Sequence, residues 1–592
     1  MEQNIVHNRT ADRKTILCVL LLAVFFLLLL WRVPFGYDWT DEEYYSVVGY
    51  RLLQGDRPLV DTWEVHQFSG MLAAPVLGAY RLLNGGSMDG SVLFLRYFYV
   101  SFQFGVSLAA FFALRNKSGN VPALLAALML LGYSHYAINS YFYDSMATLY
   151  SVLAVLLLFL FEERTRYGGG LAALSGACFA LSVLAFPYVM LALPVYLVYW
   201  ILRARKTRPE KRYLAGLGWF FAGAALIAGA MIAFMLSRAT ISELLLGARG
   251  MFSDPDHQSV NVLRILAQYL NAIRVMYAPY SYGAAALVLL GGAYRLARQT
   301  RVREWLHLIC AVFTIVLIAG ITIHASTYDW PLYYRMNMVA MGLALIAPGI
   351  YLVADGAENR ALLLYAVGCS ISVAAQIGSN TRILASSGML LPASMATALY
   401  LFDNQIAIFS VHAEHTRHTR MQPALRLERL LVFSAYALVA LFVVSICAHR
   451  IMGVYRDEPI TKLTATMDSG AGKGIRTTPE SAQQHHDMVS AIRENAPETG
   501  SLLVSYLFPE GYLLTDLKAA TPSAFNMRLD SKWLAAYYAA NPGRTPDMLV
   551  QLSTDLVFNG NAHFGATEFV RNYHLQPKQF QFITIYLKDE AD

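Results

Sequence analysis

Long runs of apolar residues recur along most of this chain, and they constrain its fold more than any other feature. A helix needs about 20 mostly apolar residues to cross the hydrocarbon core of a bilayer. Only 15% of the residues are charged and 56% are hydrophobic, too little polar surface for a water-soluble fold of 592 residues. We therefore predict a polytopic α-helical membrane protein with about 13 transmembrane helices. The runs cover residues 16–33, 91–114, 121–138, 144–161, 171–186, 188–202, 213–236, 276–296, 305–325, 333–354, 361–378, 383–402 and 430–448.

The loops between these runs differ in their content of basic residues. With a cytoplasmic N-terminus, every second loop is rich in Arg and Lys, and the short loops on the other side are nearly free of them. This alternation follows the positive-inside rule. It predicts a multi-pass protein of the cell (plasma or inner) membrane, with its N-terminus inside and its C-terminal region outside. The basic residues assigned to the inside include Arg115, Lys117, Arg164, Arg166, Arg203, Arg212, Arg295, Arg303, Arg417 and Arg429.

Three segments on the predicted outer side are too long to be simple connections. Residues 35–90 contain two amphipathic stretches, 44–53 and 68–83, which could lie along the membrane interface. Residues 237–273 form a second loop. Residues 450–592 are predicted to form a small extracytoplasmic α/β domain, separate from a transmembrane module of residues 1–449. Its expected helices cover 481–495, 531–540 and 566–573, and its expected strands cover 501–507, 547–552 and 580–587.

A cluster of carboxylates follows the first apolar run. Residues 41–45 read Asp-Glu-Glu-Tyr-Tyr, directly after Asp38, Trp39 and Thr40. Charges are unfavourable beside hydrocarbon, so acids grouped where a span ends indicate a functional site. A helix that begins with Thr40 as its N-cap would explain the acids as a local feature only. That explanation does not account for the polar segment that follows, which extends from Gly55 to Gln67.

These residues resemble the GT-C superfamily of membrane glycosyltransferases, which use polyprenyl-phosphate sugars. The resemblance is to the branch of protein O-mannosyltransferases and lipid A aminoarabinose transferases, in which an Asp-Glu pair opens the first outer loop before two interfacial helices. The matching residues here are Asp41 and Glu42 for the pair, Tyr44 or Tyr45 for the aromatic residue after it, and Gly55 with Pro58 for the turn between the helices. Motifs carry the resemblance over about the first 200 residues, and architecture alone carries it over the rest.

The resemblance implies a reaction and a set of catalytic residues. A sugar would pass from a polyprenyl-phosphate donor to a hydroxyl group of a glycan, lipid or protein acceptor on the outer face. Asp41 would be the general base, and one displacement would invert the anomeric centre. Asp144, a lone acid at the start of the fourth apolar run, resembles the second acid of the family, although a helix N-cap would also explain it. Glu42 and Asp144 would orient the acceptor or the donor. The carboxylates could hold a divalent cation, and nothing in the chain indicates nucleic-acid binding.

The donor phosphate needs a cation or hydrogen-bond donors. Relatives commonly place a Lys or His with prolines before the second interfacial helix, and this chain has Glu64 and His66 there without the prolines. Arg96, Arg335 and Arg382 are further candidates near outer helix ends, where snorkelling to the interface is an equally simple explanation. The candidate substrate-binding residues are therefore His66, Arg96, Arg335, Arg382, Glu64 and Tyr45.

Two other functions are compatible with a polytopic chain that has large outer loops. One is a transporter or flippase of lipid-linked glycans, and the other is a polysaccharide polymerase. The charged residues gather at one outer face rather than at the membrane midplane, where transporters bind their substrates. A polymerase would share the outer loops but not the early Asp-Glu pair. We therefore expect a transferase.

Overall fold

The computed structural model describes most of the chain. Two predicted elements fall largely or partly outside the described residues, namely the last apolar run, 430–448, and the helix at 566–573. The described residues are 2–588 except 136–137, 207–209, 255–260, 328–331, 355–358, 380–381, 403–433, 435–436, 439, 442, 506–507, 526–530 and 554–571.

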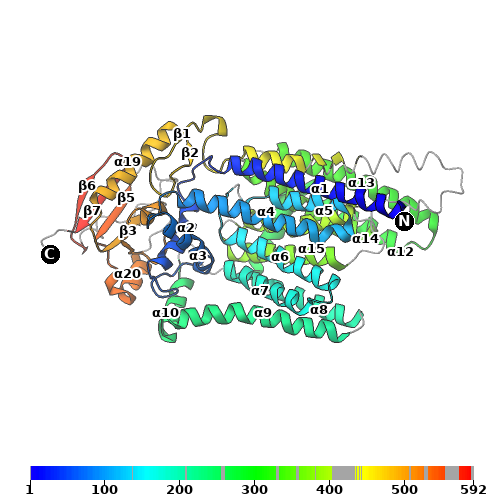
Figure 1. Ribbon diagram of the computed structural model, residues 1–592, viewed down its shortest axis with the longest axis horizontal. Coiled ribbons are helices and arrows are strands. Elements are labelled where there is room, and N and C mark those ends of the chain that lie inside the picture. The colour runs from blue at the N-terminus through cyan, green and yellow to red at the C-terminus, as the bar shows by residue number, and fades with distance from the viewer. Residues whose placement is uncertain are drawn as a thin grey trace.

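Long helices lying side by side form the larger part of the molecule (Figure 1). Among the described residues, eight helices are long and apolar enough to cross a membrane, or nine if the bent pair α11 (Val262–Met276) and α12 (Ala278–Leu296) counts as one span. The other helices of this part are α1 (Glu2–Arg32), α4 (Ser91–Ser118), α5 (Asn120–Gly132), α6 (Tyr143–Glu163), α7 (Gly168–Ala185), α8 (Leu193–Lys206), α9 (Glu210–Leu236), α13 (Thr300–Thr327), α14 (Leu332–Val353), α15 (Asn359–Gly378), α16 (Ile383–Gly388) and α17 (Leu391–Phe402).

The described residues contain fewer candidate spans than the sequence predicts. Each of the first twelve apolar runs does contain a helix, but α5 has 13 residues and α17 has 12. At a rise of about 1.5 Å per residue, such helices are shorter than the hydrocarbon core. The count of about 13 transmembrane helices and the sidedness of the loops therefore stay predictions.

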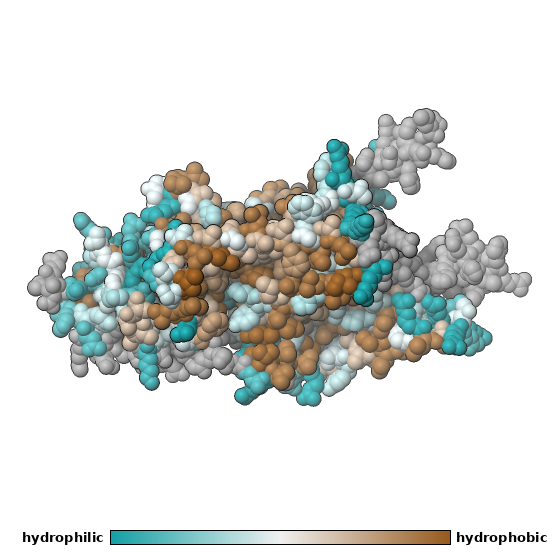
Figure 2. Space-filling model, turned by 90° about the horizontal axis from the view of Figure 1, so that it is seen from below, coloured by the Kyte–Doolittle hydropathy of each residue, from teal (hydrophilic) through white to brown (hydrophobic). Residues whose placement is uncertain are grey.

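The outer surface of the helical part is apolar. Leu20 and Leu27 on α1, Leu226 on α9 and Val316 on α13 are exposed. Figure 2 shows apolar side chains, in brown, gathered over the helices, whereas polar side chains, in teal, cover the end that carries the sheet. An exposed apolar surface of this extent is unfavourable in water but matches lipid tails. The chain is a multi-pass membrane protein.

The C-terminal part contains a mixed β-sheet. Its five strands lie in the order β4-β3-β5-β7-β6, and a two-stranded sheet, β1 (Ala465–Thr466) with β2 (Arg476–Thr477), lies apart from it. β3 pairs in parallel with β4 and β5, whereas β7 is antiparallel to β5 and β6. The predicted alternation of helices and strands is present, but the short β4 and β6 were not expected. The elements are α19 (Pro479–Asn495), β3 (Ser501–Ser505), β4 (Lys518–Ala519), α20 (Ser531–Ala540), β5 (Met548–Leu552), β6 (Leu575–Gln579) and β7 (Ile583–Lys588).

Three helices lie between the helical bundle and the sheet (Figure 1): α2 (Asp41–Leu53), α3 (Gln67–Leu83) and α10 (Ile241–Phe252). The two predicted amphipathic stretches are therefore helical. The expectation that both lie along the membrane interface is wrong for α2, because it is buried along almost its whole length. It packs on α3, α4 and η6 (Pro509–Leu513), so protein rather than lipid headgroups surrounds its polar side chains.

Candidate active site

The first turn of α2 is held by an acid that precedes it. The Asp38 carboxylate accepts hydrogen bonds from the backbone N–H groups of Thr40 (3.1 Å) and Asp41 (3.2 Å). These groups have no partner inside a helix, so an acceptor at this point stabilises the helix start. Thr40 occupies the predicted N-cap position, but its side chain forms no capping hydrogen bond. Its hydroxyl oxygen instead accepts a hydrogen bond from Arg456 at 2.7 Å.

Asp41 differs from the neighbouring acids in its exposure. Its side chain is 14% exposed, whereas that of Glu42 is 4% exposed and Asp38 and Glu43 are buried. Tyr455 donates a hydrogen bond to Asp41 Oδ2 at 2.6 Å, and Arg456 Nη1 lies 3.4 Å from the same oxygen. Within the part of the chain that the structure describes, no group forms a hydrogen bond or ion pair with Oδ1. Asp41 is thus held through one oxygen and can accept a proton on the other.

Glu42 and Arg96 form a buried ion pair between α2 and α4. Arg96 Nε donates to Glu42 Oε1 at 3.0 Å, and its Nη2 donates to Oε2. The guanidinium also donates to the carbonyl oxygens of Val33 (3.1 Å) and Gly36 (2.7 Å). Glu42 and Arg96 were predicted to orient substrate and to bind phosphate, respectively. The structure brings both to the site but binds them to each other.

Asp144 lies in the first turn of α6 and is buried. His135 Nε2 is 2.9 Å from its Oδ2, and the other imidazole nitrogen of His135 is 3.1 Å from the hydroxyl of Tyr133. Tyr133 and His135 lie in the connection between α5 and α6. Nothing in the sequence separates His135 from the other histidines, because only the fold places it against Asp144.

Aromatic rings join the first outer loop to the start of α6. The Tyr45 ring stacks on Phe142, with centroids 4.5 Å apart, and the His66 ring stacks on Tyr143 at 3.8 Å. Burial raises the pKa of Tyr45, and nearby Tyr143, Asp41 and Asp144 raise it further. Both predicted acids, Asp41 and Asp144, therefore lie close enough to influence one phenol. Tyr45 and His66 thus pack against the start of α6, and a substrate-binding role for them stays a prediction.

Glu64 contacts the C-terminal part of the chain. Ser523 donates a hydrogen bond to its Oε2, and the backbone N–H group of Trp63 donates to the carbonyl oxygen of Pro522 at 2.8 Å. Burial raises the pKa of Tyr44, and the adjacent Glu64 carboxylate raises it further. Glu64 thus fastens the first outer loop to residues 521–525. This is a structural contact that the sequence did not predict for it.

The other two arginines are not brought to the site by any described contact. The side chain of Arg335, in α14, lies outside the described residues. Arg382 precedes α16 with a left-handed backbone, φ 48°. No described residue forms a hydrogen bond or ion pair with its guanidinium. A phosphate-binding role for Arg335 and Arg382 stays a prediction.

Arg450 is a buried cation that no sequence pattern indicated. It is 1% exposed, and its Nη2 lies 3.5 Å from Gln103 Oε1, at the limit of a hydrogen bond. Its carbon Cζ lies 5.9 Å from the centre of the Tyr99 ring. Among the described residues, its Nε and Nη1 have no hydrogen-bond partner. A buried charge without an anion is unfavourable, so this guanidinium is suited to bind an anionic ligand.

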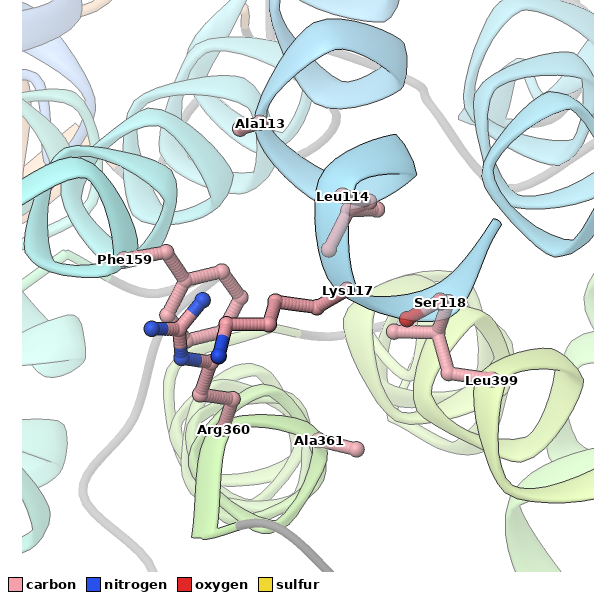
Figure 3. A pocket seen from close by; sticks show the side chains of 8 residues that line it. All are labelled: Ala113, Leu114, Lys117, Ser118, Phe159, Arg360, Ala361 and Leu399. Atoms are coloured by element: carbon pink, nitrogen blue, oxygen red, sulfur yellow. The ribbon is translucent and has the colours of Figure 1, made fainter. Parts of the chain in front are cut away.

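A small pocket lies at the other end of the bundle. Lys117 and Arg360 line it among apolar side chains of α4, α6, α15 and α17 (Figure 3). Lys117 lies near the end of α4, whereas Arg96 lies near its start. The pocket is therefore separate from the acids of α2. Its residues are Ala113, Leu114, Lys117, Ser118, Phe159, Arg360, Ala361 and Leu399.

The described residues contain no group of three or more His, Cys, Asp or Glu side chains that could hold a metal ion. Arg96 already binds Glu42, and His135 faces Asp144. The carboxyl oxygens of Asp144 and Glu43 have no hydrogen-bond partner among the described residues. A divalent cation stays a prediction.

Comparison with known proteins gives similar structures only. No protein-family model matches the chain, and no curated protein matches its sequence. The archaeal oligosaccharyltransferase AglB from Archaeoglobus fulgidus, in complex with an inhibitory peptide and a dolichol-phosphate, has a TM-score of 0.47 at 12% identity. That match covers 92% of this chain and 70% of AglB. ArnT from Cupriavidus metallidurans, bound to undecaprenyl phosphate, has a TM-score of 0.44 at 12% identity. That match covers 97% of this chain and 98% of ArnT.

The arabinofuranosyltransferase AftD from Mycobacteria has a TM-score of 0.47 at 12% identity. That match covers 98% of this chain and 40% of AftD. AglB, ArnT and AftD are all GT-C superfamily glycosyltransferases, the class that the sequence resembles. At TM-scores below 0.5 and 12% identity, these similarities carry no argument about the reaction of this chain.

Proposed function

We propose that the chain is an integral membrane glycosyltransferase. It moves a sugar from a polyprenyl-phosphate donor to a hydroxyl group of a glycan, lipid or protein on the non-cytoplasmic side of the cell membrane. The observation that supports this most is the state of Asp41. Of the four acids in residues 38–43, it has the most exposed carboxylate, and its Oδ1 has no partner among the described residues. A general base needs such an oxygen, open to the acceptor but held in position.

The reaction is a single displacement at the anomeric carbon. The acceptor oxygen attacks this carbon while Asp41 takes the hydroxyl proton, and the bond from the carbon to the phosphate oxygen breaks with its electrons on the phosphate. One displacement inverts the anomeric centre. General-base catalysis of this kind contributes about 10²–10⁴-fold to a rate. Asp144, whose Oδ2 lies 2.9 Å from His135 Nε2, orients the sugar from the side of α6.

The leaving phosphate carries negative charge and requires a cation. We assign this role to Arg450 rather than to Arg96, because Arg96 already donates four hydrogen bonds to Glu42, Val33 and Gly36. Arg450 keeps two nitrogens without partners among the described residues. A planar guanidinium with free N–H groups matches phosphate oxygens in charge and geometry.

The position of Arg450 agrees with this assignment. It faces the ring of Tyr99, and the hydroxyl of Tyr99 lies against Ser145, which follows Asp144 in α6. Gln103, its other neighbour, donates to the carbonyl oxygen of Tyr133, whose hydroxyl contacts His135. Contacts through Tyr99 and Gln103 therefore lead from Arg450 toward Asp144.

The test is sugar transfer by the purified protein from a polyprenyl-phosphate donor. Asp41→Asn keeps the size and the helix start but removes the base, so we expect a rate lower by about 10²-fold or more. Asp487→Asn on α19, a half-buried acid that accepts a hydrogen bond from Gln483, is the matched control and should transfer at the wild-type rate. Equal rates for Asp41→Asn and wild type would remove Asp41 from the mechanism.

The same preparation distinguishes a flippase. In liposomes, a flippase would move a labelled lipid-linked sugar between leaflets without forming a glycosylated product. Sugar transfer that occurs when donor and acceptor are on the same side of the bilayer would support the proposed function. Movement across the bilayer that Asp41→Asn leaves unchanged would contradict it.

A further inference from the structure

Glu43 has no role in the proposed reaction, yet its surroundings are unusual. It lies in the first turn of α2 and is 0% exposed. Among the described residues, no N–H or O–H group donates a hydrogen bond to either of its carboxyl oxygens. An ionised carboxylate without donors is strongly unfavourable inside a protein.

The charged groups with the largest effect on Glu43 are also acids. The carboxyl group of Asp38 lies within hydrogen-bonding range of Glu43, and the carboxylates of Glu510 and Glu42 are close enough to influence it. The hydroxyl of Tyr37 also lies near Glu43, but it donates its hydrogen bond to Glu510. The three carboxylates would repel a negative charge on Glu43.

The cations in this region are bound to other acids. His485 Nε2 lies 2.8 Å from Glu510, Arg96 binds Glu42, and Arg456 lies 3.4 Å from Asp41. Glu43 therefore has no cation of its own among these three. Two carboxyl groups in contact, with no donor between them, require one proton to be shared.

The backbone contacts show which of the two acids is the anion. Asp38 accepts hydrogen bonds from the N–H groups of Thr40 and Asp41, whereas Glu43 accepts none. We propose that Glu43 is protonated at neutral pH and donates a hydrogen bond to Asp38. This bond holds Asp38 as the acceptor that begins α2, and α2 in turn places Asp41. Glu43 is thus a positioning residue, and its effect on transfer rests on the proposed function of Asp41.

The expected titration agrees with the geometry. Burial raises the pKa of Glu43 well above its ordinary value, and Asp38 and Glu510 raise it further. Burial and then Glu42 raise the pKa of Asp38 to about 7, while Glu43 and Arg456 oppose the rise. When the shared proton is lost as the pH rises, the two adjacent anions repel and the start of α2 is loosened.

The first experiment detects the proton itself. A buried protonated carboxyl group gives an infrared carbonyl-stretch band that an ionised group lacks. We expect this band at pH 7 in the full-length wild type and its loss in Glu43→Gln. No difference in that band between wild type and Glu43→Gln would overturn the proposal, whatever the activity of the protein.

The second experiment measures the effect on transfer. Glu43→Gln keeps a neutral donor of the same size, so its kcat should stay within about twofold of wild type and its alkaline decline should disappear. Glu43→Ala removes the donor and should lower kcat by about tenfold or more, because a small displacement of a base is enough for that. A loss of activity in Glu43→Gln as large as in Glu43→Ala would show that the carboxylate, not the proton, is needed.

Glu42→Gln is the matched control on the same turn of α2. This variant replaces the charged partner of Arg96 with a neutral amide. We therefore expect Glu42→Gln to lower activity, whereas Glu43→Gln should leave it nearly unchanged. If neither the wild type nor any variant transferred sugar, the proposed function would fail, but the infrared band would still test the protonation of Glu43.

Discussion

Arg96 on α4 binds Glu42 on α2 through two of its nitrogens, and both side chains are almost completely buried. The same guanidinium holds the carbonyl oxygens of Val33 and Gly36, just after α1. One buried cation therefore fixes the path of the chain from the first span to the acids of α2. The ion pair is structural, although both of its residues were predicted from the sequence as site residues.

We expect Arg96→Met to destabilise the protein by about 3–5 kcal/mol, because it leaves the buried Glu42 carboxylate without a partner. Replacing both residues, Arg96→Met with Glu42→Met, should recover most of that loss, since apolar groups of similar size can replace a buried pair. Thermal unfolding in detergent measures both. A double variant less stable than either single variant would contradict this account.

Arg450→Met should raise the KM for the polyprenyl-phosphate donor and lower kcat, because the departing phosphate loses its cation. The stability of the protein should stay the same or rise, since the variant removes a buried charge without an anion. Arg450→Lys should recover part of the activity, because it restores the charge without the planar fork. Unchanged donor KM and kcat in Arg450→Met would show that phosphate binds elsewhere.

Glu510 should make the stability of the protein depend on acid pH. Burial alone would raise its pKa, but the charge and hydrogen bond of His485, with Tyr37 and the N–H group of Gly472, lower it below the ordinary value of 4.5. A carboxyl group with a lowered folded pKa stabilises the protein above its unfolded pKa, and this contribution is lost as the pH falls through the folded value.

We therefore expect Glu510→Gln to lower the stability at pH 7 by about 1–3 kcal/mol and to weaken the loss of stability below about pH 4.5. Thermal unfolding of the full chain between pH 3 and pH 7 checks both effects, with pH values spaced by about half a unit. If wild type and Glu510→Gln lost stability in parallel over this range, another group would be responsible.

Gly247 lets α10 lie directly on the first outer loop. A Cβ atom at this position would be 1.2 Å from the carbonyl oxygen of Leu59. Because that oxygen belongs to the backbone, it can move away only if the loop itself is displaced. We expect Gly247→Ala to destabilise the protein by about 1–3 kcal/mol or more. Gly229→Ala in α9 is the control: nothing lies within 4 Å of its Cβ position, so helix propensity should make it neutral or stabilising. Equal stability of the two variants would refute the close contact.

Local features of the chain were predicted well. The apolar runs locate the long helices, and the alternation after residue 478 locates α19, β3, α20, β5 and β7, because periodicity and length are properties of a short segment. The number of spans was not predictable in the same way. Whether an apolar helix of 12 or 13 residues, such as α5 or α17, crosses a membrane depends on its neighbours.

The sequence indicated single candidate residues of the site, whose roles stay predictions. Asp41, Glu42 and Asp144 were recognisable as acids at helix starts. Tyr45 and His66 were recognisable as polar or aromatic residues of the same outer loop. Their partners were not recognisable, because Tyr455 reaches Asp41 across 414 residues and Arg450 lies at the end of an apolar helix. Sequence patterns carry no information about which distant charges will face each other.

The sequence by itself determined that this is a membrane chain with an acidic cluster after its first span, because hydrophobic length and charge are read residue by residue. The tertiary structure decided what each acid does. It binds Glu42 to Arg96, buries Glu43 against Asp38 and leaves Asp41 partly open beside Tyr455. The physical reason is that the state of a carboxylate depends on the groups that surround it in space, and those come from segments hundreds of residues apart.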